Sequence, residues 1–186
     1  MKLVIAEFLR TLKERDELDR LLPDLLVEMG YVPLARPQTG NRQFGVDLAV
    51  RGKDPRSGID ELLLAVIKKG DIGRAEWDGG AQSVRQSINE ILDVYLKSHV
   101  EPPDKGKAVR IVVATNGELK QVVQASWCGF IADVQPRATV EFWGIDQLAE
   151  LIETYLLDEH VFRDDDRKQL RACELFGHAR RGGCEW

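Results

Sequence analysis

The sequence has few cysteines and no long apolar run, and each absence excludes a class of protein. Its three cysteines contain no C-x-x-C pair and its three histidines are scattered, so we expect no zinc site. No stretch reaches the run of about 20 apolar residues that crosses a bilayer. The first twenty residues lack the apolar core of a signal peptide. An odd number of cysteines without such a signal predicts a cytoplasmic protein in a reducing compartment.

The composition is that of an ordinary globular chain with a heavily charged surface. Of its 186 residues, 44% are hydrophobic and 31% are charged, so we expect one domain with a sizeable core. The formal net charge of -5 gives no support to a nucleic-acid partner. It does not exclude one either, because contact with phosphates depends on local patches rather than on the sum.

Apolar periodicity predicts an α/β protein with a mixed sheet flanked by helices. Leucines three and four residues apart around Pro23 indicate two amphipathic helices, one over about 4–15 and one from about 22 to Gly30. Extended segments follow in YVPLARP, FGVDLAV and LLLAVIKK, the last two joined as a hairpin. Helices and strands then alternate, with helices expected over 81–98, 118–134 and 145–157 and strands over 108–115 and 138–144. We assign this unit to residues 1–162 and a charged tail or linker stump to 163–186.

The hairpin carries the side chains most suited to chemistry. Asp47 lies in FGVDLAV between apolar neighbours, so it points to the opposite face of the strand from them. Lys68 closes the next strand, and Lys69 beside it is expected to reach solvent. A carboxylate next to an ammonium group suits phosphodiester hydrolysis, because the first can hold a cation and the second can orient the attacking water. For Asp47 alone, a purely structural aspartate is the simpler interpretation.

These residues resemble the PD-(D/E)xK nuclease superfamily, in the branch with Mrr-like type IV restriction enzymes and Holliday-junction resolvases. That branch has an acid on the first helix, a Gly-aromatic pair, Gly-x-Asp, and then (Glu/Gln)-x-Lys. In this chain Asp19 precedes Gly30-Tyr31, and Asp47 and Lys68 match the later motifs. The resemblance implies a restriction-endonuclease-like fold, with Asp47, Lys68 and Asp19 as the catalytic residues. For Asp19, an exposed helix residue without a catalytic role is a nearly equal alternative.

A wider resemblance covers most of the chain. The segments KKGDI, NEILDVY, VATNGELKQ and VEFWGIDQLAELIETYLLDEHVF are similar to the nuclease-like N-terminal domain of STAND-type NTPases in bacterial antiphage defence. This similarity extends to Phe162 and implies a downstream NTPase module or a homo-oligomer as a partner. A free-standing protein is the alternative.

The sequence departs from the nuclease motif at Val66, two residues before the lysine, where the family has a glutamate or glutamine. Valine has no oxygen, so Mg²⁺ or Mn²⁺ would have to be held by Asp47, the main-chain carbonyl of Ile67, Asp19 and waters. Glu61 should face the other way. Asp71 and Glu76, in the loop that follows, are open candidates for the missing oxygen.

The resemblance predicts a divalent-metal-dependent DNA endonuclease that acts as an effector in antiphage defence. The alternative left open by Val66 is a catalytically degenerate module for DNA binding or oligomerisation. Basic residues gather around the hairpin and the loop after it, as phosphate contacts require. The residues predicted to contact DNA are Arg42, Lys69, Arg74 and Arg85.

Overall fold

A five-stranded mixed sheet forms the centre of the protein. The computed structural model describes residues 1–12, 17–35 and 44–157 of the 186. The strands, in sheet order, are β1 (Val32–Ala35), β2 (Leu48–Lys53), β3 (Asp60–Lys68), β4 (Ala108–Thr115) and β5 (Thr139–Trp143). β1, β2 and β3 pair antiparallel, whereas β3, β4 and β5 pair parallel. The sheet therefore joins a meander to two crossover connections, as the sequence predicts.

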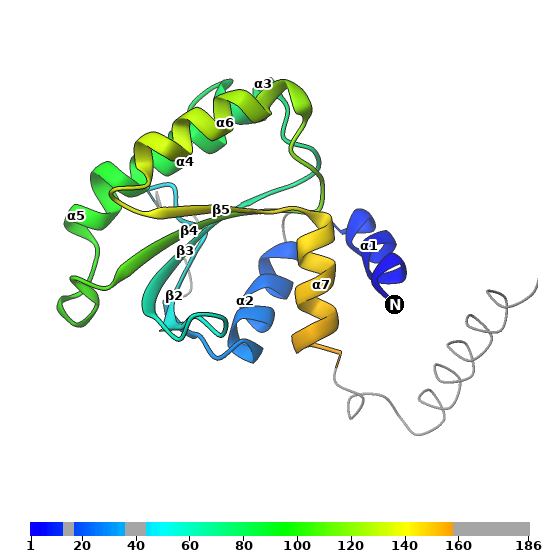
Figure 1. Cartoon of the computed structure of the whole chain (residues 1–186), viewed down its shortest axis with the longest axis horizontal. Helices are drawn as coiled ribbons and strands as arrows, with labels where there is room; N and C mark the ends of the chain where they lie inside the picture. Colours follow the sequence, from blue (N-terminus) through cyan, green and yellow to red (C-terminus); the bar gives the residue numbers. More distant parts are fainter. Residues whose placement is uncertain (13–16, 36–43, 158–186) are drawn as a thin grey trace, which may run out of the picture.

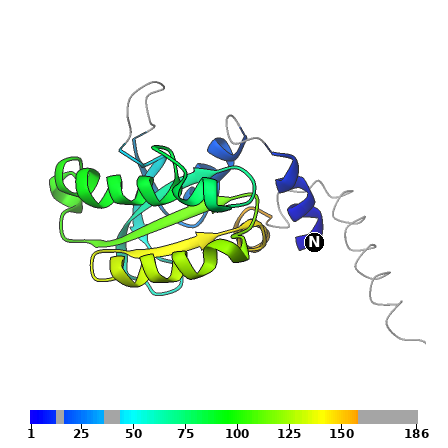
Figure 2. The ribbon, with the colours of Figure 1, turned by 90° about the horizontal axis from the view of Figure 1, so that it is seen from above.

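Helices cover both faces of this sheet (Figures 1 and 2). One layer consists of α1 (Lys2–Thr11), α2 (Asp19–Glu28) and α7 (Ile145–Tyr155). The other consists of α3 (Arg74–Asp78), α4 (Val84–Glu90), the π-helical turn η2 (Ile91–Tyr95), α5 (Leu96–Ser98) and α6 (Gln121–Val134). A 3₁₀ turn, η3 (Pro102–Asp104), precedes β4. The predicted α/β class, with a mixed sheet flanked by helices, is confirmed.

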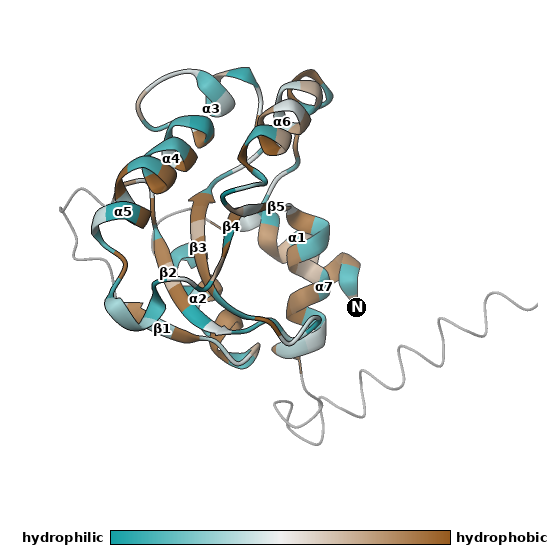
Figure 3. Cartoon of the chain, turned by 60° about the vertical axis from the view of Figure 1, so that its left-hand side comes forward, coloured by the Kyte–Doolittle hydropathy of each residue, from teal (hydrophilic) through white to brown (hydrophobic). Residues whose placement is uncertain are grey.

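The alternation of side chains along β3 explains why both layers are needed. Leu63, Ala65 and Ile67 belong to a core shared with α1, α2 and α7. The residues between them belong to a second core, shared with α3, α4 and α6. Residues 62–67 are all apolar and buried, so this part of the strand is apolar on both faces and is brown in Figure 3.

Three local expectations differ from the structure. The second helix begins at Asp19 rather than near residue 22, and Pro23 lies inside it. The proline removes only one hydrogen bond, and the buried Leu22, Leu25 and Leu26 hold the helix against the first core. A short helix, α3, occupies part of the segment expected to be a glycine-rich loop. The helix expected over 81–98 begins at Val84 and includes a π-helical turn. The predicted tail and its boundary lie outside the described residues.

None of the helices in the described ranges combines the length and the apolar character that crossing a membrane requires.

Candidate active site

Asp47 is tied to β3 on both sides of Val66. Regular pairing of β2 with β3 begins at Leu48, which lies opposite Ala65. One residue earlier, the amide of Asp47 donates to the Ala65 carbonyl at 2.9 Å. Its carboxylate Oδ2 accepts the amide hydrogen of Ile67 at 2.7 Å. Asp47 therefore lies next to the end of β3, as predicted. Its carboxylate is beside Val66, the residue at which this chain differs from the nuclease motif.

Gly45 allows this approach. Its φ of +82° lies in the region that favours glycine. A Cβ built on Gly45 would lie 2.1 Å from the carbonyl oxygen of Ser87 in α4, so no larger residue fits without a backbone shift. The glycine of the Gly-x-Asp motif thus lets the chain pass against α4 before Asp47 enters the sheet. No local pattern in the sequence indicates this contact with Ser87.

The two lysines differ as predicted. Lys68 is half-buried and lies on the same side of β3 as Val66 by strand alternation, whereas Lys69 is exposed. Within the described part of the chain, the Lys68 ammonium makes no ion pair or hydrogen bond. Val66 is fully buried and belongs to the second core. Its side chain therefore adds apolar contact at the point where the motif has an oxygen.

A buried polar clasp from β4 fixes the turn after the lysines. Thr115 and Asn116, at the end of β4, are 0% and 5% exposed. Asn116 Oδ1 accepts the Gly70 amide hydrogen at 2.8 Å, and Thr115 Oγ1 donates to the Gly70 carbonyl at 2.5 Å. Asn116 Nδ2 also donates to the carbonyls of Leu9 and Leu12, at 2.9 and 3.0 Å. The clasp joins the end of α1 to the turn that follows Lys68, a role that local periodicity does not reveal.

The other acids considered for the site are placed as follows. Asp19 begins α2 and is exposed, and its role in the site stays a prediction. Asp71 accepts the Glu118 amide hydrogen at 2.9 Å and pairs with Lys120 at 2.5 Å. The bond from Lys120 and that backbone amide hold the pKa of Asp71 below its ordinary value. Glu76 accepts the Gly73 amide hydrogen at 3.0 Å. Across the described ranges, no group of three or more His, Cys, Asp or Glu side chains is arranged to hold a metal ion.

Glu61, which the sequence places on the opposite face from Val66, belongs to a polar network at the other end of β3. Its carboxylate accepts from the Tyr31 hydroxyl at 2.7 Å and from Arg110 at 3.1 Å. Arg110 also contacts Asp54 and Glu141, each at 3.0 Å. Burial, reinforced by the bond to Glu61, raises the pKa of Tyr31 well above its ordinary value. This network lies far along the strand from Lys68 and forms part of the fold rather than of the site.

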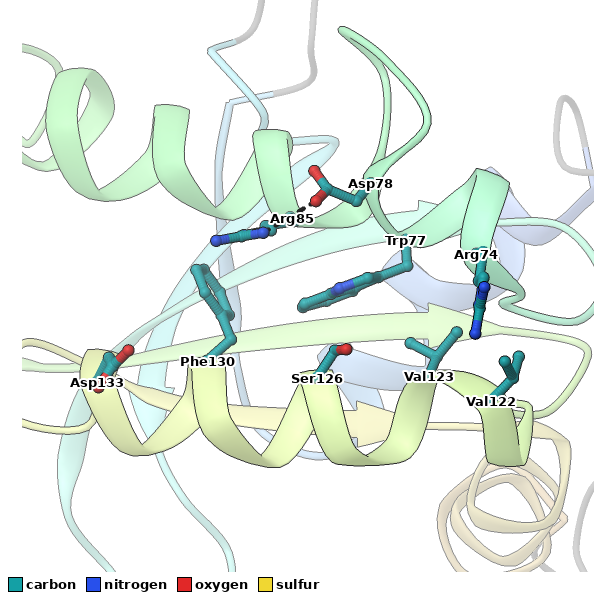
Figure 4. A pocket seen from close by; sticks show the side chains of 9 residues that line it. All are labelled: Arg74, Trp77, Asp78, Arg85, Val122, Val123, Ser126, Phe130 and Asp133. Atoms are coloured by element: carbon teal, nitrogen blue, oxygen red, sulfur yellow. Dashed lines mark hydrogen bonds and ion pairs between the residues drawn. The ribbon is translucent and has the colours of Figure 1, made fainter.

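Two of the four basic residues predicted to contact DNA line one groove. Lys69 is beside Lys68, and Arg42 lies outside the described residues. Arg74 and Arg85 line a groove of about 470 Å³ between α3, α4 and α6 (Figure 4). Arg85 pairs with Asp78 at 2.9 Å. Their contact with nucleic acid stays a prediction.

Comparisons with known proteins give limited similarity. No protein family and no curated protein matches the chain. The restriction endonuclease FokI bound to DNA is 14% identical over 90% of this chain and 29% of that chain, with a TM-score of 0.45. The MspJI restriction endonuclease in complex with a 27-mer oligonucleotide is 14% identical over 81% and 30%, with a TM-score of 0.37. This chain spans less than a third of either protein, and a similarity of this size identifies no site and no reaction.

Proposed function

We propose that the chain is a restriction-endonuclease-like domain that hydrolyses phosphodiester bonds of DNA with a divalent cation, as an effector of bacterial antiphage defence. The observation that supports this most is the position of Asp47 beside the last residues of β3, with an unpaired, half-buried lysine at its end. Within the described part of the chain, the Lys68 ammonium has no ion pair or hydrogen bond through which it could stabilise the fold. An anionic ligand would give it a role.

The residues that would hold Mg²⁺ or Mn²⁺ are Asp47, the carbonyl of Ile67 and Asp19. Mg²⁺ usually binds through one or two carboxylates and keeps several waters, so this oxygen set fits a weakly held ion. The bond from the Ile67 amide to Asp47 Oδ2 holds this carboxylate beside the end of β3. When bound, such an ion lowers the pKa of a water and stabilises charge on the phosphate.

The other roles belong to the chain itself. Lys68 would orient the attacking water or stabilise the charge that develops on the phosphate oxygens. The clasp of Thr115 and Asn116 would hold Lys68 in position by fixing the turn at Gly70. Lys69, with the predicted contacts Arg42, Arg74 and Arg85, would bind the DNA backbone.

A second candidate rests on Val66. Its side chain is fully buried in an apolar core, so it cannot supply the oxygen of the motif. The domain would then keep the nuclease fold and serve in DNA binding or oligomerisation without cleaving.

Plasmid nicking and Mn²⁺ calorimetry separate the two candidates. We expect nicking in Mg²⁺ or Mn²⁺ that is lost in Asp47→Asn and Lys68→Ala, and Mn²⁺ binding that is lost in Asp47→Asn. Lys105→Ala is the matched control, since it removes an exposed lysine charge outside the proposed site and should leave nicking unchanged. Equal nicking by the wild type and both site variants refutes the nuclease proposal. DNA binding without Mn²⁺ binding supports the degenerate module.

A further inference from the structure

A groove of about 470 Å³ lies beside α6, and its walls are of mixed character. Its floor is apolar, with Trp77, Val123 and Phe130, and Trp77 packs edge-on against Phe130 at 5.5 Å. Along its open side lies Val122, which is 52% exposed. On the face of α6 that continues from Val122 by helical spacing, four exposed residues are small, namely Ala125, Ser126, Gly129 and Ala132. An apolar floor beside a helix with small side chains permits the close approach of a second helix.

Two opposite charges stand at the ends of this groove. Arg74 projects from α3 at the end near Val122, and Asp133 lies on the last turn of α6 at the other end (Figure 4). Both side chains line the groove, and neither makes an ion pair or hydrogen bond with any described residue. The inner pair is different, because Arg85 is already neutralised by Asp78 at 2.9 Å. The groove thus offers one free cation and one free anion at opposite ends, as judged from the described ranges.

We propose that the groove is an isologous interface, in which α6 of a second copy of this chain packs antiparallel to α6. In a two-fold interface, each residue meets its counterpart in the reverse order along the helix. With the axis near Ser126, Arg74 of each copy faces Asp133 of the other. The same ion pair therefore forms twice, and the free charges of both copies are neutralised. Val122 of each copy meets the apolar floor around Phe130. A nucleic-acid strand fits less well, because the four charged residues that line the groove cancel.

This proposal gives Arg74 a protein partner in place of its predicted contact with DNA, and it does not depend on nuclease activity.

Sedimentation velocity over a range of chain concentrations tests the proposed dimer. We expect a concentration-dependent dimer. Arg74→Asp and Asp133→Arg should each raise the dissociation constant about tenfold or more, because like charges then meet twice at the interface. The double variant should restore the dimer. Asp24→Arg, an equally exposed charge reversal on α2, is the control and should change nothing.

A second readout fixes the position of the axis. Ser126→Cys should give a covalent dimer under mild oxidation, because the two copies meet there. Cys173 and Cys184 are replaced by serine in both proteins compared. The native Cys128 lies two residues further on and therefore on the opposite side of the helix, so the protein that keeps Ser126 should remain largely uncrosslinked. A monomer at the highest soluble concentration overturns the proposal, as does a charge-swapped double variant no better than the singles. Loss of DNA binding in Arg74→Asp with an unchanged oligomeric state overturns it too, and assigns Arg74 to DNA.

Discussion

Replacing Val66 by glutamate tests whether a cation can bind beside Asp47. Val66 is fully buried among apolar side chains, so a new carboxylate there has no water to solvate it. We expect Val66→Glu to lower the free energy of unfolding by about 3–5 kcal/mol in the absence of metal. Val66→Met, of similar length but apolar, should cost only about 1–3 kcal/mol through overpacking. The difference between the two variants isolates the cost of the buried charge.

A divalent cation should recover much of this loss if the site exists. The new carboxylate would lie beside Asp47, whose Oδ2 is held by Ile67, and together they provide two carboxylates. At a Mn²⁺ concentration one hundred times the dissociation constant, binding to the folded state alone contributes about 2.7 kcal/mol. Urea unfolding with and without Mn²⁺ measures the recovery, and Asp47→Asn in the same background should abolish it. If Mn²⁺ stabilises neither the Glu nor the Met variant, no cation site lies beside residue 66, and the proposed metal-dependent mechanism fails.

Three further variants test the framework around the site. Asn116→Ala removes the side-chain partner of the Gly70 amide and of the Leu9 and Leu12 carbonyls. We expect the free energy of unfolding in urea to fall by about 2–3 kcal/mol and the Gly70 amide to exchange hydrogen faster. An unchanged free energy of unfolding together with unchanged exchange at Gly70 would contradict the clasp. Arg110→Ala removes the cation shared by three carboxylates, and the cost should be about 3–5 kcal/mol at neutral pH. Hydrogen bonds from Ser57 and Arg56, together with the charge of Arg110, hold the pKa of Asp54 below its ordinary value, so part of this cost should be lost as the pH falls through that lowered pKa. A pH-independent cost would refute this reasoning. Asp71→Asn should remove a small stability contribution that is fully present above the ordinary carboxyl pKa and is lost as the pH falls through the lowered pKa of Asp71. The thermal midpoints of wild type and variant should therefore converge between neutral pH and acid. A constant difference would argue against the pair with Lys120.

The sequence predicts the strands and most helices because their signals are local. The apolar run of β3 and the stripe of buried leucines in α2 are visible without any knowledge of the fold. The nearness of Asp47 to the end of β3 is also predictable, since a hairpin places the start of one strand beside the end of the next. These features depend on spacing along the chain alone.

Features that depend on distant partners could not be predicted. Arg110 lies inside an apolar strand, and its buried partners are about 30 to 56 residues away along the chain. Asn116 reads as a turn residue after β4, whereas its amide nitrogen reaches the end of α1, more than 100 residues earlier. Gly45 is needed because of α4, 42 residues later in the chain. In each case the cause is a contact between segments that are far apart in the sequence. The spacing of apolar residues along the chain gives no information about such contacts.

Variants of Lys68 distinguish an active nuclease from a catalytically degenerate module better than variants of Asp47 do. Asp47 has a structural use, since its carboxylate closes the β2–β3 junction through the Ile67 amide, and that bond would be retained whether or not a metal binds. Lys68 has no such use within the described residues, since its ammonium makes no ion pair or hydrogen bond there and its side chain is only partly buried. We therefore expect Lys68→Met to leave the stability unchanged or to raise it slightly, while abolishing cleavage. A marked loss of stability in Lys68→Met would show that the lysine supports the fold, and the case for a catalytic lysine would then lose its main physical argument.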